Sequence, residues 1–162
     1  AAIGGFAILN RTIKWGGDGH LDLVTATDKG ASCFDCVEKA TRWIYQSPCP
    51  VKGAAFNDTD GDGKPELLLA RRDGCVIALT PDGQSRLLHQ VLEEITGLAA
   101  LDGSQGLRYA VALRGRLRLY DRAWQLVGET ARLIRRIEAV PAAEEDLLLI
   151  HAPNGRVELV SI

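Results

Sequence analysis

Short apolar runs separated by tight polar turns recur along the chain. The clearest unit has four apolar segments, at residues 51–56, 66–71, 75–79 and 85–91. The Leu-rich second segment is typical of a strand buried on both faces. Turn signals that contain Gly74 and Gly83 follow the second and third segments. The unit is therefore predicted to be four short strands joined by tight turns.

This unit is repeated. Asp22-Leu-Val-Thr-Ala26 matches Glu66-Leu-Leu-Leu-Ala70 at a spacing of 44 residues, and Gly30 matches Gly74 at the same spacing. A later copy is shorter. In it, Asp146-Leu-Leu-Leu-Ile150 matches Glu66–Ala70, and Asn154-Gly-Arg-Val-Glu-Leu159 matches Asp73–Ala78. The four copies of this core begin near Asp22, Glu66, Ala110 and Asp146.

Four-stranded units repeated every 40-odd residues are typical of β-propeller blades. A β-sandwich with accidental self-similarity is the alternative, but it would not keep glycines in register. We therefore predict an all-β fold, a β-propeller over residues 1–162 with four blade-like four-stranded repeats. The predicted blades are residues 7–50, 51–94, 95–132 and 133–162.

The N-terminal segment does not supply the strand that the last blade lacks. The sequence stops at Ile162, after the third strand of the fourth copy, so the last blade lacks its outer strand. Residues 1–6 are short and glycine-bearing, and can supply at most a poor substitute. Open sheet edges invite pairing with another strand. The ring is either a closed four-bladed propeller with one thin blade or part of a larger ring.

Composition narrows the class of protein. Charged residues make up 25% of the chain and apolar residues 46%, as in a folded globular protein. The net charge of -2 gives no global field that selects nucleic acid, and no apolar run is long enough for a membrane helix. The chain starts at Ala1 and contains no Met, which indicates a processed chain or a segment of a longer one.

An acidic loop precedes the Leu-rich strand. Asp58, Asp60, Asp62 and Glu66 stand at loop positions one, three, five and nine. Carboxylates at such positions can converge on Ca²⁺, which takes six to eight oxygen ligands. An EF-hand would need Glu at position twelve, where Leu69 stands. A solvated acidic turn without an ion is the alternative.

This loop and its repeat resemble FG-GAP/VCBS-type propeller repeats, which occur in integrin α-subunits. The resemblance implies one structural Ca²⁺ site with side-chain ligands Asp58, Asp60, Asp62 and Glu66, and with the backbone carbonyl of Lys64 as a further ligand. Glu66 departs from the usual Asp, and the other three copies have lost most ligand positions. The resemblance favours adhesion or assembly at an extracellular or cell-surface location.

Residues 106–136 contain eight arginines. They are Arg108, Arg114, Arg116, Arg118, Arg122, Arg132, Arg135 and Arg136. Alternation with leucines predicts that Arg114, Arg116 and Arg118 share one strand face. That face is either solvated and paired with acids of neighbouring blades or a docking patch for an acidic partner. Nucleic acid is not predicted, because few aromatic residues accompany the arginines.

We find no catalytic motif in the sequence. Nucleophile-elbow, P-loop and dinucleotide-binding patterns are absent, and the three histidines are scattered. Cys33 and Cys36 form a CxxC pair without a second pair of ligands, so buried or semi-buried thiols are favoured over zinc, and a disulfide stays open. We predict a non-catalytic interaction or assembly module, with a protein partner or self-assembly. The alternatives are a tryptophan-dependent lectin and a fragment of a propeller enzyme.

Overall fold

The computed structural model describes residues 3–103, 106–140 and 147–162, with the backbone alone at 102–103 and 106–108. Every regular element among them is a strand. The first two blades contain β1 (Ala7–Ile13), β2 (Asp22–Thr27), β3 (Gly30–Asp35), β4 (Ala40–Gln46), β5 (Val51–Asn57), β6 (Glu66–Arg71), β7 (Cys75–Leu79) and β8 (Ser85–Gln90). The last two contain β9 (Ile95–Gly103), β10 (Gly106–Leu113), β11 (Arg116–Tyr120), β12 (Leu126–Ala131), β13 (Arg136–Val140), β14 (Leu147–His151) and β15 (Val157–Ser161).

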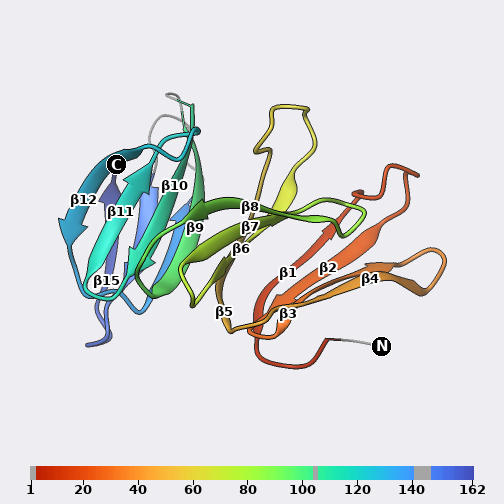
Figure 1. The fold of residues 1–162 in the computed structure, drawn as a ribbon, viewed down its shortest axis with the longest axis horizontal. Coiled ribbons are helices and arrows are strands. Elements are labelled where there is room, and N and C mark those ends of the chain that lie inside the picture. The colour runs from red at the N-terminus through yellow and green to blue at the C-terminus, as the bar shows by residue number, and fades with distance from the viewer. Residues whose placement is uncertain (1–2, 104–105, 141–146) are drawn as a thin grey trace.

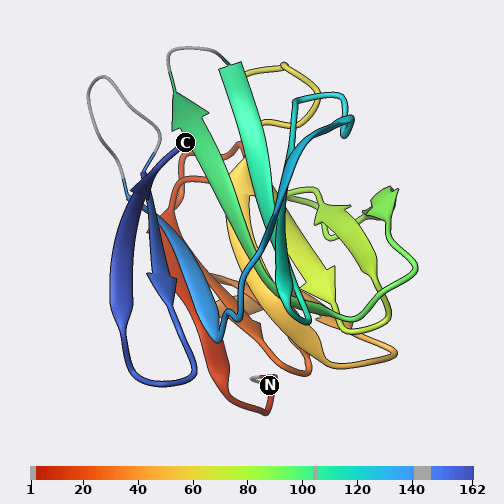
Figure 2. The same ribbon diagram turned by 90° about the vertical axis from the view of Figure 1, so that its left-hand side faces the viewer.

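These strands form four antiparallel sheets in which neighbours in sequence are neighbours in space. The sheets are arranged as successive blades around one shared cavity, so the predicted β-propeller fold with four blades is confirmed (Figures 1 and 2). The first strand of each blade lines a shared central cavity of about 520 Å³. Outer strands β4 and β12 lie at opposite sides of the molecule (Figure 1).

Glycines allow the close approaches that the ring needs. Gly53 of β5 faces the neighbouring inner strand so closely that a Cβ there would lie 2.5 Å from the backbone nitrogen of Leu98. Gly74, in the β6–β7 turn, has a φ of +88°, and a Cβ would lie 2.1 Å from the carbonyl oxygen of Val91. A larger residue at Gly53 would therefore push two blades apart, and one at Gly74 would displace the β8–β9 connection.

Hydrophobic packing between blades makes up the core. The run Leu67-Leu-Leu69 is fully buried, as predicted for a strand covered on both faces. Leu67 and Leu69 pack against the first blade, whereas Leu68 packs against the third. A third cluster, which includes Ala112 and Leu148, joins the third blade to the fourth.

The fourth blade has three strands, in the order β13-β14-β15, which confirms that its outer strand is missing. The described part of the N-terminal segment, residues 3–6, lies against the first blade instead. The Thr27 hydroxyl donates a hydrogen bond to the carbonyl of Gly4 at 2.9 Å, and the Phe6 N–H donates to the Asp28 carboxylate at 2.7 Å.

One part of the predicted repeat alignment is wrong by a single residue. Leu148 packs against the preceding blade, as Leu67 does, so Leu148 is the counterpart of Leu67. The sequence match had instead paired Leu147 with Leu67. Because side chains alternate between faces, a shift of one residue exchanges the two faces of the strand. The fourth copy therefore begins at Leu147, and Asp146 lies outside the described residues.

Candidate metal centre and its guanidinium-filled counterpart

The acidic loop joins β5 to β6 at the top of the second blade in Figure 1. Gly61 and Gly63 have φ angles of +82° and +85°, which side chains other than glycine rarely adopt. The Asp58 carboxylate accepts hydrogen bonds from the N–H groups of both glycines, at 2.7 and 2.9 Å. Lys64, the predicted carbonyl ligand, lies in the same loop and donates its N–H to Asp62 at 2.7 Å.

The four predicted carboxylate ligands converge. Asp58, Asp60, Asp62 and Glu66 each offer an oxygen atom, and these atoms lie within 4.8 Å of one another. An all-oxygen set of this size suits a hard divalent cation such as Ca²⁺, whose bonds to oxygen are about 2.3–2.6 Å. Glu66 is buried, and its Oε2 atom accepts hydrogen bonds from the Thr59 N–H at 2.9 Å and the Thr59 hydroxyl at 2.5 Å.

The loop favours ionised Asp58. Desolvation opposes ionisation, but the backbone N–H groups of Gly63 and Gly61 outweigh it and lower the pKa of Asp58. Asp58 therefore carries its negative charge across the ordinary pH range, which is the state that a cation ligand requires.

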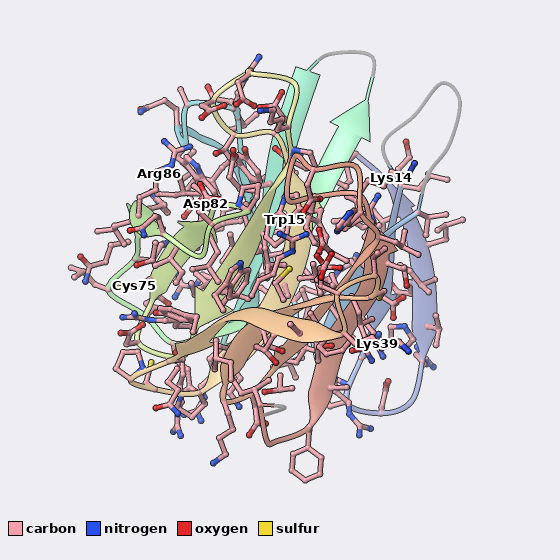
Figure 3. The ribbon with its side chains drawn as sticks, turned by 90° about the vertical axis from the view of Figure 1, so that its right-hand side faces the viewer. Lys14, Trp15, Lys39, Cys75, Asp82 and Arg86 are labelled. Carbon is pink, nitrogen blue, oxygen red and sulfur yellow. The ribbon has the colours of Figure 1, made fainter. Side chains whose placement is uncertain are left out.

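Two arginines from other elements approach the loop. Arg86 of β8 donates a hydrogen bond to the Thr59 hydroxyl at 2.6 Å. Its Nη2 atom lies 3.9 Å from Asp60 and 4.0 Å from Glu66 (Figure 3, where Arg86 is labelled). Arg122 comes from the β11–β12 turn, and its Nη2 atom would lie 2.5 Å from a Cβ at Gly61. Part of the loop's charge is thus balanced by the protein itself.

The first blade contains a second version of this arrangement. Arg42 is 44 residues before Arg86, and Asp22 is 44 residues before Glu66. The Nε atom of Arg42 donates to Asp22 at 2.7 Å. Its Nη2 atom donates to Asp18 at 2.5 Å and to Asp35 at 2.6 Å. The guanidinium therefore occupies the middle of three carboxylates.

The backbone contacts are repeated as well. The Trp15 N–H donates to Asp22 at 3.2 Å, as the Thr59 N–H does to Glu66, and Trp15 is 44 residues before Thr59. The Gly16 N–H donates to the same Asp22 oxygen at 2.9 Å. The acid that opens the second strand thus holds the preceding loop in both blades.

Ionisation in the first blade follows these contacts. The pKa of Asp35 is lowered to about 2. The largest cause is the hydrogen bond from the backbone N–H of Glu38. Hydrogen bonds from His20 and from the backbone N–H of Val37, and the nearby Arg42 charge, act in the same direction. The hydrogen bond to Asp35 in turn raises the pKa of His20. Asp18, His20 and Asp35 lie close enough together to hold a metal ion, but Arg42 contacts two of them directly.

Sequence reasoning found the loop of the second blade but missed the Arg42 cluster. The signal was present, because the internal repeat places an arginine at the same position in both blades, at Arg42 and Arg86. Asp35 could not be found in this way, because its counterpart in the second blade is a leucine and the contact depends on the third strand.

The predicted arginine patch is paired with acids. Arg118 lies 2.6 Å from Glu129 and 3.2 Å from Glu93, and Arg116 lies 3.4 Å from Glu93. These contacts agree with the interpretation of a solvated face balanced by neighbouring acids. Arg114 lies in the β10–β11 turn, so the prediction that it shares a strand face with the other two is wrong.

The tryptophans have packing contacts. The Nε1 atom of Trp15 donates to the Pro65 carbonyl at 2.6 Å, and that of Trp43 donates to the Pro81 carbonyl at 2.7 Å, so both join the first blade to the second. Trp124 stacks on Tyr109 at 4.1 Å between ring centroids. These positions do not form the exposed, equivalent pockets that a tryptophan-dependent lectin would need.

All four cysteines are free thiols, two of them buried and one exposed. Cys33 and Cys75 are the buried pair, and burial raises the pKa of Cys33 to about 12. A thiol with that pKa stays protonated and is a poor nucleophile. Cys33 therefore acts as a small apolar core residue, as the sequence favoured.

Comparison with known proteins identifies the fold. This chain is similar to a crystal structure of BBS1N in complex with ARL6DN, with a TM-score of 0.75 and 12% identity over 99% of this chain and 56% of that one. It is also similar to the computationally designed Ika4 protein, with a TM-score of 0.65 and 15% identity over 99% of this chain and 94% of that one. Sqt1 from Saccharomyces cerevisiae matches with a TM-score of 0.65 and 13% identity over 94% of this chain and 47% of that one.

The fold is a β-propeller. The chain spans about half the length of the BBS1N chain that it matches. No protein-family model and no curated protein sequence matches it, so the resemblance to FG-GAP/VCBS-type repeats stays a prediction. Among the described residues, no helix is long and apolar enough to cross a membrane.

Proposed function

We propose that this chain is a non-catalytic protein-interaction and assembly module of the scaffold or adhesion type. The observation that carries the proposal is the open edge of β15. Three blades have four strands each, and the fourth blade stops at its third strand. A strand from a partner protein would complete this sheet, a mode of recognition known as β-augmentation.

The hydrogen-bonding groups of β15 support this role. The Ala152 N–H donates to the Arg156 carbonyl at 2.9 Å and closes the β14–β15 turn. Antiparallel pairing then alternates along the strand, so the backbone groups of Val157, Leu159 and Ser161 point away from β14. These unpaired N–H and C=O groups offer a partner strand a ladder.

The comparisons support the general class of function. BBS1N is a propeller neighbour whose crystal structure contains a bound protein, ARL6DN. A propeller scaffold that docks protein partners is therefore a reasonable model for this chain, although the identity of the partner does not transfer at 12% identity.

We propose further that the loop of the second blade binds one Ca²⁺ through Asp58, Asp60, Asp62 and Glu66, with the carbonyl of Lys64. The ion would neutralise converging carboxylates and hold the connection between β5 and β6, which is a structural role. The same family resemblance supports an extracellular or cell-surface location.

Peptide binding tests the open edge. A fluorescein-labelled peptide with the sequence of residues 124–133 contains outer strand β12, and we expect it to raise fluorescence anisotropy when it pairs with β15. Leu159→Pro removes one outward-facing N–H group and should abolish binding, whereas the matched control Leu159→Ala keeps that group and should still bind.

Ser161→Pro repeats the test at the next outward-facing position. Far-UV circular dichroism shows whether each variant keeps its sheets. Absence of binding to the unmodified chain would refute strand addition at β15. So would proline variants that bind the peptide as tightly as the unmodified chain does.

A further inference from the structure

Three hydrophobic clusters join four blades. They lie between the first and second, the second and third, and the third and fourth blades. Within residues 3–103, 106–140 and 147–162, no cluster joins the fourth blade to the first. Each inner blade therefore has two covered faces, whereas the two end blades have one covered face each.

The uncovered face of the first blade is apolar at positions that are buried elsewhere. Leu23 is 39% exposed, whereas its counterpart Leu67, which the second blade presents to the first, is 0% exposed. Phe34 pairs with Leu23 across the sheet, as the fully buried Leu79 pairs with Leu67, but Phe34 is only half-buried. Ile44 on the adjacent strand is 40% exposed. This face has the chemistry of a blade interface without its partner.

The uncovered face of the fourth blade shows the same difference. Val157 is 53% exposed and Leu159 is 58% exposed. Their counterparts Val76 and Ala78, on the face that the second blade presents to the third, are both 0% exposed. The two free faces thus correspond to the two sides of one blade-to-blade contact.

The curvature of the chain fits half of a larger ring. Nearly the whole chain superposes on 56% of BBS1N, with a TM-score of 0.75. It superposes on 47% of Sqt1, with a TM-score of 0.65. In these two propellers, the unmatched part of the chain is about as long as the matched part. Ika4, which is matched over 94% of its own length, corresponds instead to one copy of this chain. A second set of four blades would therefore supply the missing half.

We propose that the occupant is a second copy of this chain, packed head to tail. The fourth blade of each copy covers the first blade of the other, so the two copies close one eight-bladed ring through two identical contacts. The chain carries both sides of the contact, so no other partner is needed. The inference rests on the proposed assembly function, but it uses sheet faces and leaves the edge of β15 free.

Light scattering after size-exclusion chromatography tests the ring. We expect twice the 17.5 kDa mass of the chain at tens of micromolar protein. Leu23→Lys and Val157→Lys each place a charge in both contacts, because every contact uses one face from each copy. Burying an unpaired charge is costly, so each variant should raise the dimer dissociation constant by about tenfold or more.

Leu92→Lys is the matched control, because Leu92 is almost fully exposed in the β8–β9 connection and lies on neither free face. It should remain a dimer. All three positions are exposed in the single chain, so unfolding curves should change little. Leu23→Lys should still bind the β12 peptide, which separates failure of the ring from failure of the proposed edge recognition.

A mass of 17.5 kDa for the unmodified chain at all concentrations would overturn the proposal. So would an open-ended series of masses, because that is the behaviour of head-to-tail contacts that do not close. A dimer that survives both lysine variants would place the contact elsewhere, for example at the β15 edge, and would also overturn it.

Discussion

Replacing Arg42 with alanine should destabilise the first blade strongly. The change leaves Asp22 fully buried without its cationic partner and removes the guanidinium contacts to Asp18 and Asp35. Removing one partner of a buried ion pair costs about 3–5 kcal/mol. Asp22 keeps two backbone N–H donors, and the Arg42 side chain is partly exposed, so we expect a loss at or just below the lower limit of that range, about 2–3 kcal/mol.

Urea unfolding followed by tryptophan fluorescence measures this loss. Trp15 reports on the site because its backbone N–H donates a hydrogen bond to Asp22. For a chain of this size, a loss of about 2–3 kcal/mol corresponds to a fall in Tm of roughly 5–10 °C. Arg86→Ala is the matched control, since Arg86 occupies the same repeat position but is about half-exposed, and its loss should cost less than about 1 kcal/mol.

A double-mutant cycle tests the physical cause. Asp22→Asn removes the buried charge and keeps an oxygen for the two backbone donors, so it should recover part of the stability that Arg42→Ala loses. Equal costs for Arg42→Ala and Arg86→Ala would refute the conclusion that the guanidinium holds the first-blade cluster together. Strict additivity of the Arg42 and Asp22 changes would refute the charge-pairing argument.

Four further predictions concern the acidic loop, the first-blade cluster and the core. Ca²⁺ added after EDTA should raise the Tm of the unmodified chain but not that of Asp60→Asn; an unchanged Tm in both would remove the case for an ion. Arg86→Gln should strengthen the Ca²⁺ response, because it removes a positive charge 3.9 Å from Asp60, and a weaker response in calorimetric titration would contradict this. The pKa of Asp35 is about 2 in the folded chain and about 3.9 in an unfolded chain, so ionised Asp35 stabilises the fold above pH 4 and this stability is lost as pH falls toward 2. Asp35→Asn should therefore make the free energy of unfolding in urea less dependent on pH between about 4 and about 2. An unchanged pH dependence would assign the effect to other groups. Tyr109→Phe should cost about 1–2 kcal/mol, because the buried hydroxyl donates to Asn57 at 3.0 Å, and an unfolding midpoint equal to that of the unmodified chain would show that the bond has no net value.

The blade pattern was predictable because it is local. Strand length, the Leu-rich runs and the glycine turns all follow from short-range rules, and the 44-residue spacing repeats them. Counting apolar segments also predicted the three strands of the fourth blade. The acidic loop was equally visible, because its carboxylates and its two glycines lie within nine residues.

The tertiary structure decided what depends on distant strands and on ring curvature. Arg42 meets Asp22 and Asp35 because three strands of one sheet place them together, although Asp35 has no acidic counterpart in the next blade. The register of β14 differs by one residue from the sequence match, because apolar residues occupy consecutive positions and only packing selects a face. The sequence alone determined which segments are blades; the tertiary structure decided which faces are covered, because burial depends on the angle at which each blade meets the next.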